Sequence, residues 1–360
     1  MLSFFPLKEI SFQEQGSGNG GITLREEVIM KQILLKIGLG GVVLLIITTL
    51  FQTGLWGAEF ERRDVTFKSH GLKCAGWYYV PKGLKSDEKR PAIIMAHGYS
   101  GVKEMYLDKF AEKFVDAGFV VLVFDYRYFG DSEGEPRGQL FYFDQLQDYR
   151  NGITWVSLQK EVDPQRIGIW GSSLSGGHVL HLAAFDRRVK VVVAQLPGTD
   201  IWETFYQARK PEVLAKRSAW LAQNRIDEYT KNTVNYFPVV APEGQPCVLP
   251  QKESYDWITE TAKLRAPNWK NQVTVESLEI NAEYAPTKYI HLISPTPLLM
   301  IVASDDIVVP TKFQKEAFDR AREPKKLVEV KGGHFDAYQG PGFVEFSTQA
   351  VEWFKKNLKP

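Results

Sequence analysis

Short runs of apolar residues alternate with segments of helical spacing through most of the chain. Ala92–Ala96, Val120–Phe124 and Ile167–Trp170 are apolar throughout, which is typical of strands buried on both faces. Between such runs, apolar residues recur every three or four positions, as in Tyr106–Ala117. This alternation predicts an α/β protein with a mainly parallel, doubly wound sheet. The other predicted strands are Val65–Phe67, Cys74–Val80, Val189–Ala194, Leu298–Ala303 and Lys326–Val330, and the other helices of this framework are Gln145–Leu158, Thr311–Arg322 and Phe343–Leu358.

Residues 201–290 interrupt that alternation. Helical spacing in Trp202–Leu214 and Ala219–Tyr229 is followed by prolines at positions 238, 242, 246 and 250, which predict irregular loops. At ~90 residues the segment is longer than an ordinary connection between elements. We therefore expect a helical cap, inserted over the edge of the sheet in a globular domain that spans residues 59–360.

The first 58 residues differ from the rest of the chain. Residues 1–29 are polar, contain several glycines and lack a sustained period, so we expect a disordered or non-native extension, with synthesis beginning at Met30. From Met30 the pattern changes: Lys31 and Lys36 precede 22 residues, 37–58, that carry no charge. This is the form of a signal peptide or a transmembrane anchor.

Lysines on the leading side of the apolar run favour an amino end that stays inside the cell. We therefore expect a protein that is membrane-anchored or exported, with its domain 59–360 outside the cytoplasm and the membrane as a partner of residues 30–58. The sequence does not decide between a cleaved signal peptide and a retained anchor.

Charge and cysteine content exclude several classes of protein. A net charge of +1 with no basic patch argues against a nucleic-acid partner. Cys74 and Cys247 lie far apart, with no C-x-x-C pair or histidine cluster, which excludes a disulfide framework and a thiolate zinc site. We expect neither a metal nor a cofactor.

One predicted strand runs directly into a helix through a serine-rich turn. Ile167–Trp170 is followed by Gly171, Ser172, Ser173, Leu174, Ser175 and two further glycines. A very tight turn of this kind holds its central serine out at the carboxyl edge of the sheet, where it serves as a nucleophile. Ser173 is the preferred candidate because a glycine lies two positions before it. Ser175 is the alternative, since the pattern is G-x-S-x-S-G rather than G-x-S-x-G.

A serine nucleophile needs a base, and the base needs an orienting carboxylate. His334 follows the last predicted strand, and Asp306 follows the strand Leu298–Ala303, so both side chains belong at the same edge as Ser173. The chain order Ser, Asp, His is the one expected of a hydrolase with a nucleophile elbow. Asp305 and Asp200 are the alternative acids.

Acyl chemistry also requires donors for the oxyanion that develops on the carbonyl. The backbone N–H of Leu174 lies at the start of the predicted helix, where N–H groups have no helical partner. The backbone N–H of Tyr99, just after His97 and Gly98, is the natural second donor.

Five motifs together resemble the α/β-hydrolase superfamily, in its X-Pro dipeptidyl-peptidase-like, dienelactone-hydrolase-like and polyketide-transferase-like branch. They are H-G-Y-S-G, F-D-Y-R-Y-F-G-D-S-E-G, G-S-S-L-S-G-G-H, D-D-I-V-V-P and G-G-H-F-D, and the likeness runs from about Val65 to Leu358. The resemblance implies an α/β-hydrolase fold, with Ser173 as nucleophile, Asp306 as acid, His334 as base, and Tyr99 and Leu174 as oxyanion donors.

The expected activity is hydrolysis of an ester or amide (peptide) bond of a small-molecule or peptide substrate through an acyl-enzyme, without a metal. An acyltransferase of the same fold is the alternative within enzymes. A catalytically inactive, membrane-tethered binding module is the alternative outside them.

Overall fold

The fold of residues 59–360 is known from a computed structural model, and these are the residues that the structure describes. The predicted extension 1–29 and the predicted apolar anchor or signal 30–58 lie outside them. Within residues 59–360, no helix is both long enough and apolar enough to cross a membrane.

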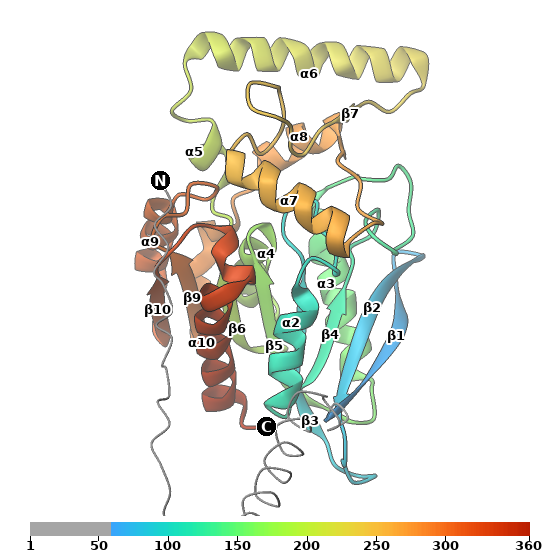
Figure 1. Ribbon diagram of the computed structural model, residues 1–360, viewed down its shortest axis with the longest axis vertical. Helices are drawn as coiled ribbons and strands as arrows, with labels where there is room; N and C mark the ends of the chain where they lie inside the picture. Colours follow the sequence, from blue (N-terminus) through green and yellow to red (C-terminus); the bar gives the residue numbers. More distant parts are fainter. Residues whose placement is uncertain (1–58) are drawn as a thin grey trace, which may run out of the picture. The chain divides into compact units, whose positions relative to one another are not determined.

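An eight-stranded sheet forms the centre of the domain (Figure 1). Its strands lie in the order β1-β2-β4-β3-β5-β6-β9-β10; β1 and β2 pair antiparallel, β2 pairs antiparallel with β4, and all other neighbours are parallel. The predicted mainly parallel α/β sheet is therefore confirmed. The strands are β1 Phe60–Ser69, β2 Leu72–Pro81, β3 Arg90–Ala96, β4 Val120–Phe124, β5 Val162–Ser172, β6 Val189–Gln195, β9 Leu298–Ala303 and β10 Lys325–Val330.

Helices cover both faces of this sheet. In β4, Leu122 packs in one core cluster with residues of α3 and α4, whereas Val121 and Val123 pack in the other with residues of α2 and α10. Because successive strand residues point to opposite faces, an apolar run such as β4 is buried on both sides. The helices are α2 Leu107–Asp116, α3 Tyr142–Ser157, α4 Leu174–Phe185, α9 Thr311–Arg320 and α10 Gly340–Leu358.

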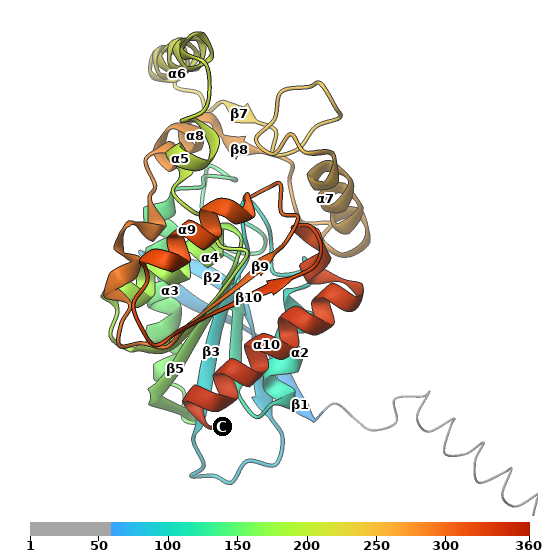
Figure 2. The same cartoon turned by 90° about the vertical axis from the view of Figure 1, so that its left-hand side faces the viewer.

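The cap lies between β6 and β9 in the chain and beyond one end of the sheet (Figures 1 and 2). It contains three longer helices, a short one and a two-stranded sheet, followed by a 3-10 turn. The elements are α5 Ile201–Phe205, α6 Pro211–Lys231, β7 Tyr236–Phe237, α7 Lys252–Arg265, β8 Val273–Thr274, α8 Val275–Ala282 and η1 Pro286–Leu292.

The predicted continuous helix Trp202–Leu214 is wrong, because the chain leaves the helix between α5 and α6. Lys210, with φ −62° and ψ 144°, is extended. The following Pro211 disfavours a helical conformation at the residue before it and then serves as the first residue of α6.

Candidate active site

The turn from β5 into α4 places Ser173 in a strained conformation. β5 ends at Ser172 and α4 begins at Leu174, and Ser173 between them has φ 58° and ψ −125°. A residue other than glycine rarely adopts positive φ, and such strain persists where surrounding structure enforces it. A Cβ atom on Gly171 would overlap the carbonyl oxygen of Ser175, so only glycine fits at that position. The local backbone is that of a nucleophile elbow.

The two candidate serines have different surroundings. Ser173 lines a cavity of about 410 Å³, and His334 lines the same cavity. Ser175 is fully buried, and its Oγ lies 3.0 Å from the hydroxyl of Tyr126 in the core. The geometry therefore favours Ser173 over Ser175 as the accessible serine.

His334 and Asp306 form a buried pair. Nδ1 of His334 lies 2.8 Å from Oδ2 of Asp306, and both residues are almost completely buried. The other oxygen of Asp306 accepts hydrogen bonds from the backbone N–H groups of Val308 and Val309, at 2.9 and 2.8 Å. A carboxylate held in this way orients the imidazole, whose Nδ1 donates to it, and leaves Nε2 as the nitrogen that can accept a proton.

The alternative acids do not contact His334. Asp305 is exposed, and its Oδ2 accepts a hydrogen bond from Ser304. Oδ1 of Asp200 accepts hydrogen bonds from the backbone N–H and the hydroxyl of Thr287. This carboxylate therefore links the loop after β6 to η1.

The cap covers the loop that carries His334. The ring of Trp257, on α7, stacks on Phe335 with ring centroids 4.7 Å apart and an angle of 23° between planes. Both aromatic residues line the cavity that contains His334. The sequence had indicated loops here and missed α7 entirely, because its apolar positions do not form a continuous stripe.

Tyr99 and Leu174 meet at the elbow. A Cβ atom on Gly98 would lie 2.9 Å from the Cβ of Ser173, so the backbone before Tyr99 passes very close to the serine. Leu174 is the first residue of α4, and its N–H therefore has no acceptor within that helix. Both residues line the cavity, in positions from which backbone N–H groups can serve an oxyanion.

His97 also lines the cavity, but its chemistry differs from that of His334. Its Nδ1 lies 3.0 Å from the carbonyl oxygen of Gly98. Burial lowers the pKa of His97 to about 4, so the ring is neutral near pH 7. The domain thus contains a second cavity histidine, and unlike His334 it has no carboxylate within hydrogen-bond distance.

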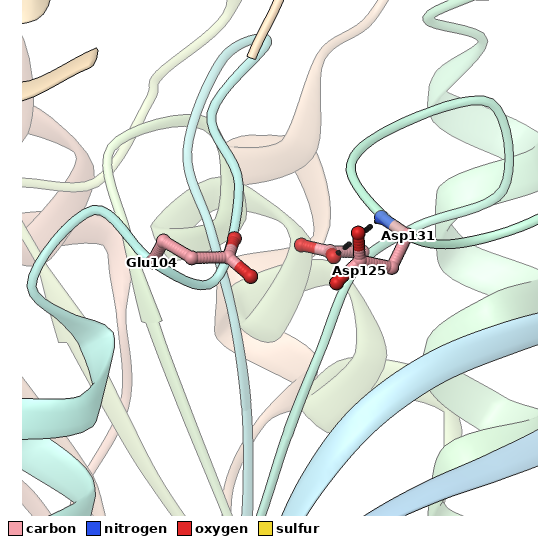
Figure 3. A group of neighbouring side chains, drawn as sticks. All are labelled: Glu104, Asp125 and Asp131. Atoms are coloured by element: carbon pink, nitrogen blue, oxygen red, sulfur yellow. Dashed lines mark hydrogen bonds between the residues drawn. The ribbon is translucent and has the colours of Figure 1, made fainter. Parts of the chain in front are cut away.

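A buried lysine organises the loop after Tyr99. Three carboxylates, Glu104, Asp125 and Asp131, converge in a group of the size that can hold a metal ion (Figure 3). The ammonium of Lys103 bonds all three, at 2.7, 2.8 and 2.5 Å. Lys103 therefore already supplies the positive charge at this position, and the neighbouring carboxylates raise the pKa of the lysine despite its burial.

The same cluster fixes the backbone on the oxyanion side of the cavity. Oδ1 of Asp125 accepts the backbone N–H of Lys103 at 2.7 Å, and Oδ2 accepts that of Asp131 at 3.1 Å. Asp125 and Asp131 both lie in the motif F-D-Y-R-Y-F-G-D-S-E-G, but the motif alone predicts no role for them. The sequence feature that could have indicated this cluster is the pair of acids six positions apart, together with Lys103 in the preceding loop.

Comparison with known proteins identifies the family of the chain. Residues 75–336 match the family model of the X-Pro dipeptidyl-peptidase (S15 family). Because the match spans well over half of the chain, the protein belongs to this family of α/β hydrolases.

Individual relatives carry several different descriptions. The chain is 32% identical over 293 residues to the quorum-quenching protein AidA of Acinetobacter baumannii, covering 81% of this chain and 94% of that one. It is 31% identical over 267 residues to the thiohydrolase aneE of Aspergillus aculeatus, covering 71% and 80%.

Among solved structures, the α/β hydrolase GrgF from Penicillium sp. sh18 superposes with a TM-score of 0.71 at 26% identity, covering 83% of this chain and 99% of that one. A polyketide transferase grgF from Penicillium sp. is 28% identical over 283 residues, covering 78% and 91%. The expected α/β-hydrolase fold and branch are thereby confirmed.

Proposed function

We propose that this protein is a serine hydrolase that works through an acyl-enzyme. Ser173 attacks the carbonyl carbon of the substrate while His334 accepts the hydroxyl proton, and Asp306 holds the imidazole in the required orientation. The N–H groups of Tyr99 and Leu174 stabilise the oxyanion. His334 then donates its proton to the leaving group, and water, activated by the same histidine, releases the acid.

One observation carries this proposal: Ser173, in its strained turn, shares a cavity with His334, whose Nδ1 bonds the buried carboxylate of Asp306. Backbone strain persists where the surrounding structure enforces it, often at functional sites. A buried Asp–His pair that shares a cavity with a serine is the set of groups that activates a hydroxyl. A binding module without catalysis requires none of these features.

The cavity favours a carboxylic ester or thioester with an apolar acyl group. Its walls include Ile201, Phe205, Val248, Leu249 and Ile258, and its volume lies in the range of small-molecule sites. The thiohydrolase description of one relative supports a thioester as the substrate. The dipeptidyl-peptidase description of the family supports a peptide bond as the alternative.

An acyltransferase is the second candidate, favoured by the polyketide transferase among the relatives and by the cap that covers the cavity. In that reaction an alcohol, amine or thiol attacks the acyl-enzyme in place of water, and its proton passes to His334. Exclusion of water by the cap would favour the acceptor.

Residues 30–58 direct the protein to the membrane in this proposal, as a retained anchor or a cleaved signal, so that the catalytic domain lies outside the cytoplasm. The uncharged run 37–58 behind Lys31 and Lys36 supports it. Membrane fractionation of the native host, with amino-terminal sequencing of the mature chain, tests it: a full-length chain that stays in the cytosolic fraction would contradict the proposal.

The enzymatic proposal is tested by a screen of p-nitrophenyl esters, acyl thioesters and prolyl amides of increasing chain length. Each is assayed with and without an added alcohol or thiol acceptor, and the products are identified by mass spectrometry. Free acid as the main product supports hydrolysis, whereas new esters or thioesters support transfer. Turnover that is the same in a Ser173→Ala variant would contradict both.

A further inference from the structure

The wall of the cavity carries positive charge without any compensating acid. Arg209 and Arg217 line the same cavity as Ser173 and His334, and no aspartate or glutamate lines it within the described part of the chain. The surface between the arginines and the elbow is apolar, through Ile201, Phe205 and Val213. Arg217 is half-buried and Arg209 is exposed at the rim. A guanidinium beside an apolar wall gains from an anionic partner that accepts its hydrogen bonds.

Neither arginine has a protein carboxylate within 4.0 Å in residues 59–360, although other arginines of the cap do. Arg225 lies two turns farther along α6 and pairs with Glu279 of α8, with Nε 2.9 Å from Oε2. Arg265 of α7 forms a pair of hydrogen bonds, each 2.7 Å long, with Asp108. The cap therefore neutralises the arginines that point away from the cavity and leaves two inside it unneutralised.

The guanidinium of Arg217 is held in place by neutral groups. Nη2 donates to the carbonyl oxygen of Leu278 at 2.7 Å, and the guanidinium carbon lies 4.5 Å from the ring centroid of Tyr206. These contacts fix the plane of the group but occupy few of its five N–H donors. Nε of Arg209 donates a hydrogen bond to the carbonyl oxygen of Phe205, at 3.1 Å, and the two terminal nitrogens remain available to a ligand.

We infer that Arg209 and Arg217 form a subsite for an anionic group of the substrate, a carboxylate or a phosphate, at the cap end of the cavity. This inference rests on the proposed acyl-transfer function, since it places the acyl carbonyl at Ser173 and the anion across the apolar wall. Guanidinium groups match both anions because their N–H donors form a planar fork. The anion is either part of the acyl chain or part of the leaving group.

The alternative is a structural role for Arg217, as a link between α6 and α8 through Leu278. That role predicts equal losses for charged and neutral substrates when the link is removed. The subsite predicts a loss that depends on the charge of the substrate, so the ratio between matched substrates separates the two.

The experiment compares two matched pairs of substrates. The first pair is the p-nitrophenyl monoester of octanedioic acid and p-nitrophenyl octanoate, which differ by a carboxylate at the end of the chain. The second pair is octanoyl-phosphopantetheine and octanoyl-pantetheine, which differ by a phosphate in the leaving group. We expect a higher kcat/KM for the charged member of one pair, and the pair that shows it identifies the source of the anion.

In Arg217→Met and Arg209→Met, the charged-to-neutral ratio of kcat/KM should fall about tenfold, the value of one charge-assisted hydrogen bond. Arg217→Lys, which keeps the charge but not the fork, should lie between. Lys216→Met is the matched control, because Lys216 is exposed on the same helix and does not line the cavity, and its ratio should not change. Ratios at or below one in the wild type for both pairs, or ratios unchanged by both arginine substitutions, would overturn the inference.

Direct binding separates failure of the subsite from failure of the proposed catalysis. Calorimetry on Ser173→Ala with monomethyl octanedioate, dimethyl octanedioate and coenzyme A needs no turnover. An anion that binds Ser173→Ala and loses about tenfold in affinity on adding Arg217→Met supports the subsite even if no hydrolysis is found. Equal affinity for monomethyl and dimethyl octanedioate, with no binding of coenzyme A, would contradict it.

Discussion

The hydroxyl of Ser175 lies 3.0 Å from the hydroxyl of Tyr126, in the core below the elbow. Substituting Ser175 by Ala should therefore leave the nucleophile in place while removing one buried hydrogen bond. We expect fluorophosphonate labelling within about threefold of the wild-type rate and a loss of about 1 kcal/mol in the free energy of unfolding. Urea denaturation and labelling kinetics measure the two quantities, and loss of labelling in a folded variant would assign the reaction to Ser175.

Asp306→Asn should lower kcat by about 10³ to 10⁴, because an amide no longer stabilises the imidazolium and favours the wrong tautomer of His334. The amide oxygen of the asparagine can still accept the hydrogen bonds from the backbone N–H groups of Val308 and Val309, so we expect the variant to fold. The matched control is Asp305→Asn, whose carboxylate is exposed and bonds Ser304. Steady-state kinetics compare the two, and a larger loss in Asp305→Asn than in Asp306→Asn would reverse the assignment.

Gly98→Ala should impair catalysis more than stability. The added Cβ would lie 2.9 Å from the Cβ of Ser173, which displaces the serine or the backbone leading to Tyr99. Misplacement of this size at a reacting group costs about 10²-fold in rate. We expect that loss in kcat with a clearly cooperative thermal transition. Wild-type kcat in the variant would show that the loop after β3 and the turn after β5 accommodate the added Cβ.

The stability of the domain should fall as the pH drops below 6.5, in part because of His178. This side chain is fully buried between Tyr284 and Gln145, and burial lowers the pKa of His178 to about 3. Between pH 6.5 and 3 the unfolded chain binds a proton at this position that the folded chain does not, so the free energy of unfolding decreases as pH decreases through that window.

Urea unfolding at pH 7.5 and pH 5 tests this contribution. His178→Asn removes the titrating group, so the decrease in unfolding free energy between the two pH values should be smaller in the variant than in the wild type. An identical decrease in both proteins would show that His178 titrates normally in the folded state.

The framework of the sheet could be predicted because its strands are short and apolar throughout. Val120–Phe124 and Leu298–Ala303 coincide with β4 and β9 to the residue. A strand buried on both faces has no polar positions to obscure its limits. By contrast, β1 begins at Phe60 rather than Val65, because its first residues are mostly exposed and charged.

The cap could be predicted only in outline. Helix α6 buries just Leu221 and Asn224, and α7 buries three residues, so neither helix has the broad apolar stripe on which sequence periodicity depends. The place of Ser175 could not be inferred either, because its partner Tyr126 is 49 positions away. Likewise, Arg217 on the mostly exposed α6 and Arg209 just before that helix have the sequence pattern of solvated surface residues. Only the structure shows that they line the cavity.

The central claim, that Ser173 is the nucleophile activated by His334, is tested most directly by labelling with a fluorophosphonate probe. In this reaction the serine oxygen bonds to phosphorus, fluoride leaves, and His334 takes the hydroxyl proton. Peptide mass spectrometry should locate the adduct on Ser173 of the wild type, and labelling should be absent from Ser173→Ala and at least 10³-fold slower in His334→Ala. An adduct on another residue, or undiminished labelling of folded Ser173→Ala, would contradict the account.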